Sequence, residues 1–233
     1  MPEINYLWTP PAPVSLPVRG TGARFPVNRL FFVGRNYQAH AIEMGSSVDK
    51  ASMRPMYFTK SSANLALSGG TAPYPPETRD YHHEMELVVA IGEPGFRVSE
   101  SSARRMIYGY ACGLDMTRRD LQTALKDKGR PWELGKSFDR SAPIGPLHPA
   151  SAIGHPSTGR IWLTVNGVLK QQGDLADLIW SVPETIAHLS RYFELRPGDL
   201  IFTGTPEGVG PVVRGDLLTG GVAGVGELSV RIL

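Results

Sequence analysis

The segment Tyr81–Ile91 constrains the fold of this chain more than any other part of its sequence. It ends in Leu87–Ile91, a continuous run of apolar residues, and such a run is typical of a strand that is covered on both faces. Glu84 and Glu86 lie just before the run. Because side chains alternate along a strand, both carboxylates should lie on one face, with His82 beside them. The chain must therefore place two acids on one face of a strand that leads into a buried run.

A pair of like charges in such a place needs a compensating partner. Two carboxylates on one strand face repel each other, and burial raises their pKa values unless a cation is present. Asp115 lies near the end of a second apolar segment, Ile107–Met116, and offers a third carboxylate. Three oxygen ligands without cysteine suit Mg²⁺, Mn²⁺ or Ca²⁺. The alternative is a solvated sheet face on which Glu84 and Glu86 each form a salt bridge.

Composition excludes several classes of function. The chain has 233 residues, with 24 Lys and Arg against 22 Asp and Glu, and a formal net charge of +2. This balance argues against a nucleic-acid binder, which usually carries a basic stripe. No stretch approaches the ~18 apolar residues of a membrane span, and Met1–Gly20 lacks the pattern of a signal peptide. The single cysteine, Cys112, fits a reducing compartment, so we expect a cytoplasmic protein that binds neither nucleic acid nor membranes.

The chain divides into an arm and a body. Residues 1–28 are rich in proline and should form an extended N-terminal arm. Four apolar residues of this arm could contact the body or a second subunit: Ile4, Tyr6, Leu7 and Trp8. Residues 29–233 contain no linker of disordered composition, so we expect a single α+β domain with more strand than helix. The 26 glycines and 20 prolines of the chain indicate many turns between short strands.

Local patterns predict the individual elements. Strands are expected at residues 30–33, 56–59, 81–91, 107–116, 161–165, 168–171 and 200–203, and within 212–233. Helices are expected at residues 38–44, 99–106 and 118–128, and from residue 182 to about 193. Thr117 and Ser181 should be N-caps, because each precedes an acid by three residues. Asn166-Gly167 predicts a two-residue hairpin.

His40 and Glu43 offer a candidate general base. They are three residues apart in the predicted helix 38–44, so their side chains share a face and can touch. A carboxylate beside an imidazole raises its basicity and fixes its tautomer, so the pair could take a proton from water. A surface His–Glu pair on a short helix is the alternative.

Other polar residues are placed by simpler reasoning. Arg119 and Gln122 lie one turn apart after Asp115, so both can point toward a metal, although Arg118 could face inward instead. Residues 204–210 lack the Gly-Lys-Ser/Thr ending of a phosphate loop, which excludes a nucleotide site of that kind. Hydrogen bonding or packing accounts for His82, His83, Tyr37, Phe58 and Cys112.

Five motifs, in this order, resemble those of the fumarylacetoacetate hydrolase family. They are VGRNYQAH (33–40), HHEMEL (82–87), LDMTRRD (114–120), GKSFD (135–139) and TGTPEGVG (203–210). The similarity runs from about residue 29 to the C-terminus. It implies a mixed β-sheet roll or barrel with few short helices.

The resemblance also implies roles for residues that the patterns alone leave open. It implies Glu84, Glu86 and Asp115 as ligands of one Mg²⁺ or Mn²⁺ per subunit, with Ca²⁺ able to replace it in vitro. His40, oriented by Glu43, would be the base on a mobile lid that includes residues 46–54. Lys136 would stabilise developing negative charge. Substrate contacts are implied for Arg119, Gln122 and Thr205, with further positive charge at the pocket mouth from Arg35 and Lys60.

The size of the chain and its arm resemble most the branch of the family that hydrolyses acylpyruvates. The expected reaction is cleavage of a carbon–carbon bond in a small anionic 2-oxo acid, 3-fumarylpyruvate of gentisate catabolism, by a homodimer. Within the family, the alternatives are decarboxylation of oxaloacetate and isomerisation or decarboxylation of 2-hydroxyhepta-2,4-diene-1,7-dioate. A metal-dependent binding protein without catalysis is a further alternative, and the presence of both His40 and Glu43 argues against it.

Overall fold

The strand that carries the acidic pair lies at the centre of the largest sheet. In the computed structural model, which describes residues 5–233, β8 (Met85–Ile91) runs antiparallel to both of its neighbours, β15 (Leu200–Phe202) and β9 (Ile107–Leu114). All seven residues of β8 are buried, which confirms a strand covered on both faces. The sheet continues through β3 (Leu30–Val33) and β4 (Tyr57–Lys60) on one side, and through β11 (Ala142–Ile144), β5 (Leu65–Leu67) and β12 (His148–Pro149) on the other.

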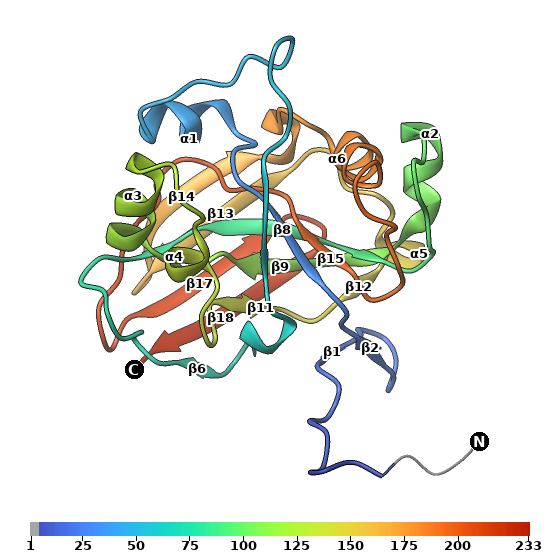
Figure 1. Cartoon of the computed structure of the whole chain (residues 1–233), viewed down its shortest axis with the longest axis horizontal. Coiled ribbons are helices and arrows are strands. Elements are labelled where there is room, and N and C mark those ends of the chain that lie inside the picture. Colours follow the sequence, from blue (N-terminus) through green and yellow to red (C-terminus); the bar gives the residue numbers. More distant parts are fainter. Residues whose placement is uncertain (1–4) are drawn as a thin grey trace.

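A second sheet packs against one face of the first (Figure 1). Its strand order is β14 (Val168–Asp174), β13 (Arg160–Val165), β17 (Leu217–Val222), β18 (Gly226–Ile232) and β6 (Thr71–Ala72). Leu87 and Val89 of β8 belong to the core between the two sheets. Val88 and Ala90 face the other way, into a core formed inside the curl of the large sheet. By the alternation of the strand, Glu86 also faces this concave interior.

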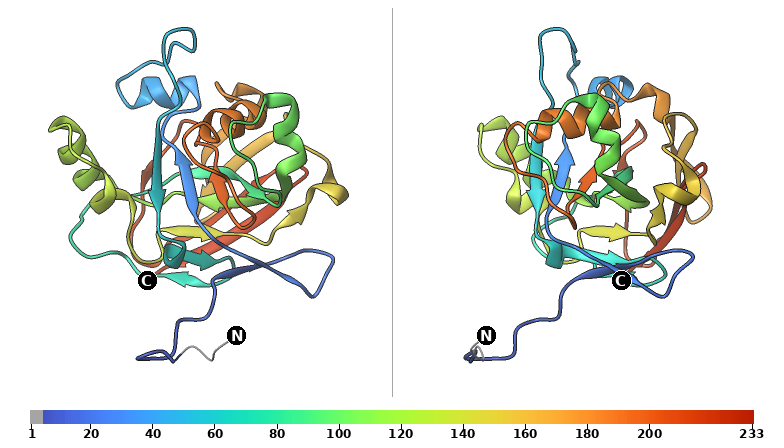
Figure 2. Two further views of the ribbon diagram at one scale, coloured as in Figure 1. Left: turned by 45° about the vertical axis from the view of Figure 1, so that its right-hand side comes forward. Right: turned by 90° about the vertical axis from the view of Figure 1, so that its right-hand side faces the viewer.

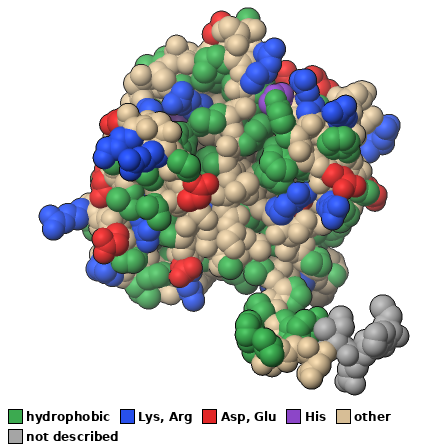
Figure 3. All heavy atoms as spheres, in the orientation of Figure 1, with side chains coloured by type: hydrophobic (Ala, Val, Ile, Leu, Met, Phe, Trp, Pro, Cys, Tyr) green, Lys and Arg blue, Asp and Glu red, His purple; other side chains and the backbone are tan. Residues whose placement is uncertain are grey.

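An N-terminal hairpin closes one end of the concave interior. The strands β1 (Ser15–Pro17) and β2 (Arg24–Pro26) pair antiparallel, and their residues Leu16 and Phe25 are buried in the same core as Val88. The hairpin lies at the opposite end of the molecule from α1 (Gln38–Glu43) (Figure 2). Of the apolar residues of the arm, Tyr6, Leu7 and Trp8 are exposed and Ile4 lies outside the described residues. Figure 3 shows apolar side chains gathered on this projecting N-terminal segment.

The helices are few and short, as expected. Besides α1 they are α2 (Glu100–Ala103), α3 (Arg119–Asp127), α4 (Glu133–Lys136), α5 (Ala150–Ile153) and α6 (Val182–Leu189), with 3₁₀ turns at Ser62–Asn64, Arg104–Met106 and Leu175–Asp177. The predicted capping box of Ser181 and Glu184 opens α6. Asn166 and Gly167 adopt positive φ angles of 51° and 80° at the predicted hairpin. No helix among the described residues is long and apolar enough to cross a membrane.

The predicted strand 81–91 is in fact two strands, and this corrects the sequence analysis. β7 (Tyr81–His83) leaves the large sheet and pairs with β10 (Thr117–Arg118) and β16 (Gly210–Pro211). The break falls at Glu84, whose carbonyl accepts a hydrogen bond from Asp115 N at 2.9 Å. Glu84 therefore lies at a junction between two sheets, where the strand changes partners.

Helix boundaries differ from the predictions at two places. Thr117 is not an N-cap: α3 begins one residue later, after Arg118, without a side-chain cap. The reason is that Thr117 Oγ1 has other partners, since it donates to Asp115 O at 3.1 Å and accepts from Lys136 Nζ at 2.7 Å. α6 ends at Leu189, four residues short of the expected end near Phe193. The helices α4 and α5 were not predicted.

Candidate active site

Three buried carboxylates meet where β8 begins and β9 ends. Oxygen atoms of Glu84, Glu86 and Asp115 all lie within 4.8 Å of one another. The pairing of β8 with β9 explains this meeting, because Met85 lies opposite Leu114, which brings the residue before Met85 beside the residue after Leu114. An antiparallel pair thus collects acids that are about thirty positions apart in the chain.

The carboxylates do not share the same electrostatic environment. Burial, together with the charges of Asp115 and Glu84, raises the pKa of Glu86 well above its usual value. Burial would also raise the pKa of Glu84, but Lys136 and Arg119 hold it well below its usual value. Burial raises the pKa of Asp115 despite Lys136 and Lys60 nearby. The protein's own cations therefore leave part of the negative charge uncompensated.

This donor set fits a divalent cation. Asp115 Oδ1 is buried and makes no hydrogen bond, although Lys60 Nζ lies 2.7 Å from it. Glu86 Oε2 accepts one hydrogen bond, from Gly204 N at 2.7 Å. Carboxylate oxygens in a buried cluster are the ligands that Mg²⁺ and Mn²⁺ prefer, and an added positive charge removes the cost of keeping Glu86 and Asp115 ionised together.

Two lysines hold the cluster from different sides. Lys136, at the end of α4, donates to Glu84 Oε2 at 2.8 Å and to Asp115 Oδ2 at 2.5 Å. Lys60 donates to the carbonyls of Met116 and Ser141 at 2.9 and 2.8 Å. Burial lowers the pKa of Lys60 to about 8. Lys60 thus lies behind the carboxylates, fully buried, and not at the pocket mouth where we expected it.

The helix α3 directs Arg119, and not Arg118, toward the cluster. Arg119 forms an ion pair with Glu84 and donates to Gln122 Oε1 at 2.5 Å. Arg118 instead places its guanidinium 4.3 Å from the centre of the Phe138 ring. The structure therefore brings Arg119 and Gln122 together beside the carboxylates.

The His40–Glu43 pair forms on α1 as expected. His40 Nδ1 lies 3.0 Å from Glu43 Oε2, and His40 is 5% exposed. The second oxygen, Glu43 Oε1, accepts a hydrogen bond from Gly208 N at 3.0 Å. The glutamate therefore joins α1 to the loop of residues 204–210.

A small cavity connects the histidine with the carboxylate cluster. Its volume is about 40 Å³, which is room for ordered water beside the histidine. The lining includes the predicted site residues Arg35, His40, Glu84, Arg119, Gln122 and Lys136, and also Met44, Thr123, Lys126 and Trp132.

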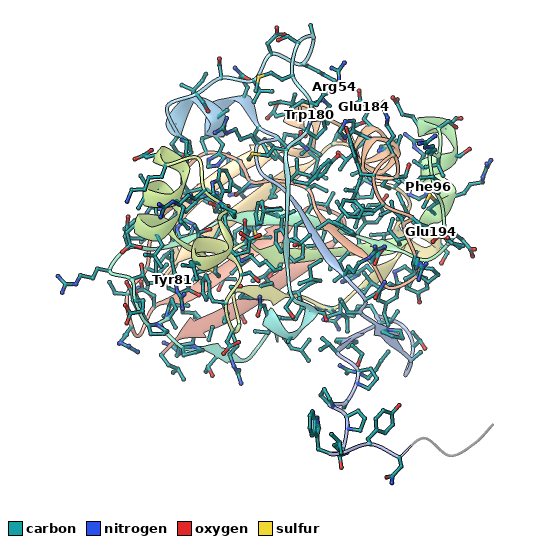
Figure 4. The ribbon with its side chains drawn as sticks, in the orientation of Figure 1. Arg54, Tyr81, Phe96, Trp180, Glu184 and Glu194 are labelled. Atoms are coloured by element: carbon teal, nitrogen blue, oxygen red, sulfur yellow. The ribbon has the colours of Figure 1, made fainter. Side chains whose placement is uncertain are left out.

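The segment predicted to form a lid follows His40 and Met44, which line the cavity. Residues 46–54 contain no helix or strand and rise from the body after α1 (Figures 1 and 2). Ala41 and Val48 pack against Trp180 in a small separate core. Lys50 Nζ adds an exposed ion pair with Glu184 Oε1 at 2.7 Å. Figure 4 shows Arg54, Trp180 and Glu184 at this end of the molecule.

Two buried amides that the sequence analysis did not single out support the site. Asn36 donates from Nδ2 to the carbonyls of Trp180 and Thr203, and its Oδ1 accepts from Trp180 N at 2.7 Å. Gln171 Nε2 donates to Thr205 Oγ1 at 2.8 Å, and Thr205 is itself buried and is not among the residues that line the cavity. The only signal for Gln171 was a polar residue in a hairpin strand, which is ordinary, so its burial could not be anticipated.

Comparisons with known proteins agree with this geometry. Residues 29–233 match the family model described as fumarylacetoacetate (FAA) hydrolase C-terminal. A fumarylpyruvate hydrolase of Ralstonia sp is 53% identical over 189 residues, covering 81% of this chain and 98% of the relative. A mitochondrial oxaloacetate tautomerase of Bos taurus is 42% identical over 200 residues, covering 86% and 89%. The crystal structure of fumarylpyruvate hydrolase from Pseudomonas aeruginosa in complex with Mn²⁺ and pyruvate is 53% identical, with a TM-score of 0.95 and coverage of 98% and 99%.

Proposed function

Because the chain belongs to the fumarylacetoacetate hydrolase family, we propose that it is a metal-dependent hydrolase that cleaves the carbon–carbon bond of an acylpyruvate. The substrate is 3-fumarylpyruvate, an intermediate of aromatic catabolism, and the products are fumarate and pyruvate. One observation carries the proposal: His40 and Lys136 line the same cavity as Glu84, in a chain that is 53% identical to a fumarylpyruvate hydrolase. A base, a cation and one carboxylate of the acidic cluster thus face one space.

The three clustered acids Glu84, Glu86 and Asp115 would hold one Mg²⁺ or Mn²⁺. When bound, the ion supplies Lewis-acid stabilisation of negative charge on substrate oxygens. Lys136 already bridges two of these acids, so its ammonium lies beside the position where that charge develops. It is therefore the residue we assign to electrostatic stabilisation of the leaving group.

His40 is the group that activates water. A carboxylate accepts hydrogen bonds, so the contact with Glu43 Oε2 places the imidazole proton on Nδ1 and leaves the lone pair of Nε2 free to take a proton. The carboxylate also stabilises the imidazolium that forms. Because His40 lines the cavity, a water there can lose its proton to Nε2 while its oxygen attacks substrate.

The bond changes then follow in order. The hydroxide oxygen adds to the distal acyl carbonyl, and collapse of this adduct breaks the bond between the acyl carbon and the pyruvate methylene. The electron pair leaves on the pyruvate enolate, whose charge Lys136 stabilises, and the imidazolium of His40 returns its proton to the enolate carbon. Water thus adds its oxygen to the fumarate and a hydrogen to the pyruvate.

Recognition of the anionic substrate is shared among several polar residues. Arg119 and Gln122 lie beside Glu84, so we assign them to the 2-oxo-acid end. Arg35 lines the cavity without an ion pair among the described residues, and we assign it to the far carboxylate. We assign Thr205, which follows Gly204 beside Glu86, to a substrate contact, and Lys60 supports Asp115 from behind.

A second candidate is a reaction of oxaloacetate. The bovine relative is named as an oxaloacetate tautomerase, and tautomerisation needs only a proton moved between carbon and oxygen. The same base could do this without attack by water. Decarboxylation of oxaloacetate, or isomerisation of 2-hydroxyhepta-2,4-diene-1,7-dioate, would use the same charge stabilisation.

A substrate panel tests these assignments. The protein is stripped of metal, supplied with Mn²⁺ or Mg²⁺, and assayed with fumarylpyruvate, acetylpyruvate, oxaloacetate and the dienoate. We expect kcat/KM to be highest for fumarylpyruvate, with loss of activity in EDTA. Equal turnover of acetylpyruvate would contradict the assignment of the far carboxylate to Arg35, and faster conversion of oxaloacetate would favour the second candidate.

We also propose that the protein is a homodimer and that it is located in the cytoplasm. We place the catalytic machinery in residues 29–233 and propose that residues 5–14, which precede the hairpin packed on the body, contact a second subunit in a homodimer. The exposed Tyr6, Leu7 and Trp8 support this role, since they offer apolar surface for such a contact. A cytoplasmic location is supported by the single cysteine, Cys112, whose thiol is buried with its pKa raised to about 12.

A further inference from the structure

We propose that Gln171 is a positioning residue of the active site. It fixes the loop of residues 204–210 to the start of β8, and this loop in turn holds one metal carboxylate and the acid that orients the base. The inference rests on the proposed function, because it assigns a role within the same site.

The side-chain amide of Gln171 uses all of its hydrogen-bonding capacity. Its Oε1 accepts from Met85 N at 3.0 Å and lies 3.0 Å from His83 Nδ1. Its Nε2 donates to Thr205 Oγ1 at 2.8 Å and to Pro206 O at 2.9 Å. One amide therefore joins β7 and β8, on either side of Glu84, to the loop.

The burial of Gln171 is exceptional for its strand. It is 1% exposed, and it is the single buried residue of β14. Buried polar groups are costly unless their hydrogen bonds are satisfied. A glutamine in this position is therefore explained by the four partners it joins, and not by the packing of the hairpin.

The loop that Gln171 fixes contacts carboxylates from two different parts of the site. Gly204 N donates to Glu86 Oε2 at 2.7 Å, and Gly208 N donates to Glu43 Oε1 at 3.0 Å. Glu86 belongs to the large sheet, whereas Glu43 belongs to α1 of the lid. A shift of the loop would therefore move a metal ligand and the orienting acid together.

The backbone of β14 holds the same loop at a second point. Gly208 has a φ of 89°, and a Cβ at this position would lie 2.1 Å from Lys170 O. The loop thus rests directly on the residue that precedes Gln171. With the loop resting there, the Gln171 amide sets where Thr205 and Pro206 lie relative to β8.

The test compares Gln171→Met with Gln172→Met. Both replace a glutamine of β14 by an unbranched side chain of similar length, but Gln172 is exposed. Three quantities are measured: the Mn²⁺ dissociation constant by calorimetry, kcat and KM for fumarylpyruvate, and amide hydrogen exchange of residues 204–210. For Gln171→Met we expect about 10-fold weaker Mn²⁺ binding and a kcat lowered about 10- to 100-fold, the range typical of groups that orient metal ligands. KM should change less than threefold.

Hydrogen exchange separates positioning from general stability. In Gln171→Met, exchange should accelerate in residues 204–210 and stay unchanged in β8 and β9, whereas Gln172→Met should match the wild type in all three measurements. A folded Gln171→Met with wild-type Mn²⁺ affinity, kcat and loop exchange would overturn the proposal. A wild type that binds Mn²⁺ but does not hydrolyse fumarylpyruvate would contradict the proposed function alone, since affinity and exchange still decide the role of Gln171.

A second variant covers the case in which Gln171→Met does not fold. Gln171→Glu keeps an acceptor for Met85 N but loses both donors to Thr205 and Pro206. It should fold, show faster exchange in residues 204–210, and have a kcat lowered about 10-fold. If neither variant folds, Gln171 serves the stability of the whole domain, and the proposal is overturned.

Discussion

The carboxylate cluster and the lid above it are built in opposite ways. Glu84, Glu86 and Asp115 are each 5% exposed or less and lie on or next to paired strands of the large sheet. The lid has a helix of six residues and a segment without regular structure. Its buried core consists of Ala41, Val48 and Trp180, with the partly buried Met53 and Ile179 packed against them. Segments with few buried contacts open at low free-energy cost. The cluster is therefore held by more buried contacts than the segment after α1, as the proposed roles of a metal site and a lid require.

This difference divides the reaction between the two regions. In the proposed mechanism the cluster supplies the metal ligands and Lys136, whereas the lid supplies His40 and Glu43. The contact of Glu43 with Gly208 N is a hydrogen bond that joins the lid to the loop beside the cluster. Variants of the cluster should therefore abolish metal binding, and variants of the lid should impair hydrolysis while the metal stays bound.

The largest effect is expected from Glu86→Gln. Loss of one of three anionic ligands should weaken Mn²⁺ binding more than 100-fold, and activity should fall on the order of 1000-fold. The same variant should stabilise the metal-free protein. The folded-state pKa of Glu86 is raised, so this carboxyl lowers the stability progressively as the pH rises from its unfolded-state pKa to its folded-state pKa, and a neutral amide removes the cost. Calorimetry with Mn²⁺ and thermal unfolding in EDTA measure both effects, and we expect a Tm higher by about 2–4 °C. An unchanged or lower Tm in EDTA would show that the carboxylates do not strain the metal-free cluster.

His40→Ala should impair the lid function while the cluster stays intact. Removal of a general base typically costs 100- to 10,000-fold in rate, so hydrolysis of fumarylpyruvate should fall by about that factor. The Mn²⁺ dissociation constant should stay within twofold of the wild type, because the hydrogen bond of His40 is to Glu43 and not to a proposed metal ligand. Weaker Mn²⁺ binding in this variant would contradict the division between the two regions. Decarboxylation of oxaloacetate, if present, should survive the change.

Gly208→Ala tests the hydrogen bond from Gly208 N to Glu43, which connects the lid to the loop beside the cluster. A Cβ there would meet Lys170 O at 2.1 Å, and φ is 89°, so the loop must shift and its bond to Glu43 must lengthen. We expect kcat to fall about 10-fold in steady-state assays. Gly129→Ala is a matched control, since Gly129 also has a positive φ of 61° but nothing lies within 4 Å of its Cβ. Equal losses in both variants would assign the effect to backbone strain.

The smallest effect is expected from Lys50→Ala. The ion pair between Lys50 and Glu184 is exposed on the lid surface, and such pairs contribute ~0–1 kcal/mol. Lid closure should weaken slightly, so KM for fumarylpyruvate should rise less than threefold and kcat should stay unchanged. The rise should vanish in 0.5 M salt, which screens surface charges. A large loss of kcat would show that this ion pair controls closure.

Local patterns in the sequence predicted elements well where neighbouring residues decide them. The apolar run of β8, the hairpin at Asn166-Gly167 and the capping box at Ser181 are each set by residues close in the chain. Predictions were wrong where distant residues compete. Thr117 has the pattern of an N-cap, but its hydroxyl bonds Lys136 and Asp115 instead, and no local pattern contains that competition.

The candidate site shows the same limit. The acidic pair and the His40–Glu43 spacing could be identified from the chain, because alternation along a strand and the turn of a helix relate residues two or three apart. Gln171 could not be identified, because its partners lie at positions 83, 85, 205 and 206. Lys60 was placed at the pocket mouth from its charge alone, whereas folding put it behind Asp115.

The sequence by itself determined which chemistry is available: oxygen ligands for a divalent ion, an imidazole with its acid, and cations for an anionic substrate. Only the tertiary structure decided how these groups share one small cavity, and which cations are already engaged by the protein's own carboxylates. The physical reason is the separation along the chain over which each effect acts. Side-chain periodicity acts over a few residues, whereas burial and Coulomb interactions depend on where distant segments pack, and it is packing that brings Glu43 and Glu86 into contact with the same loop.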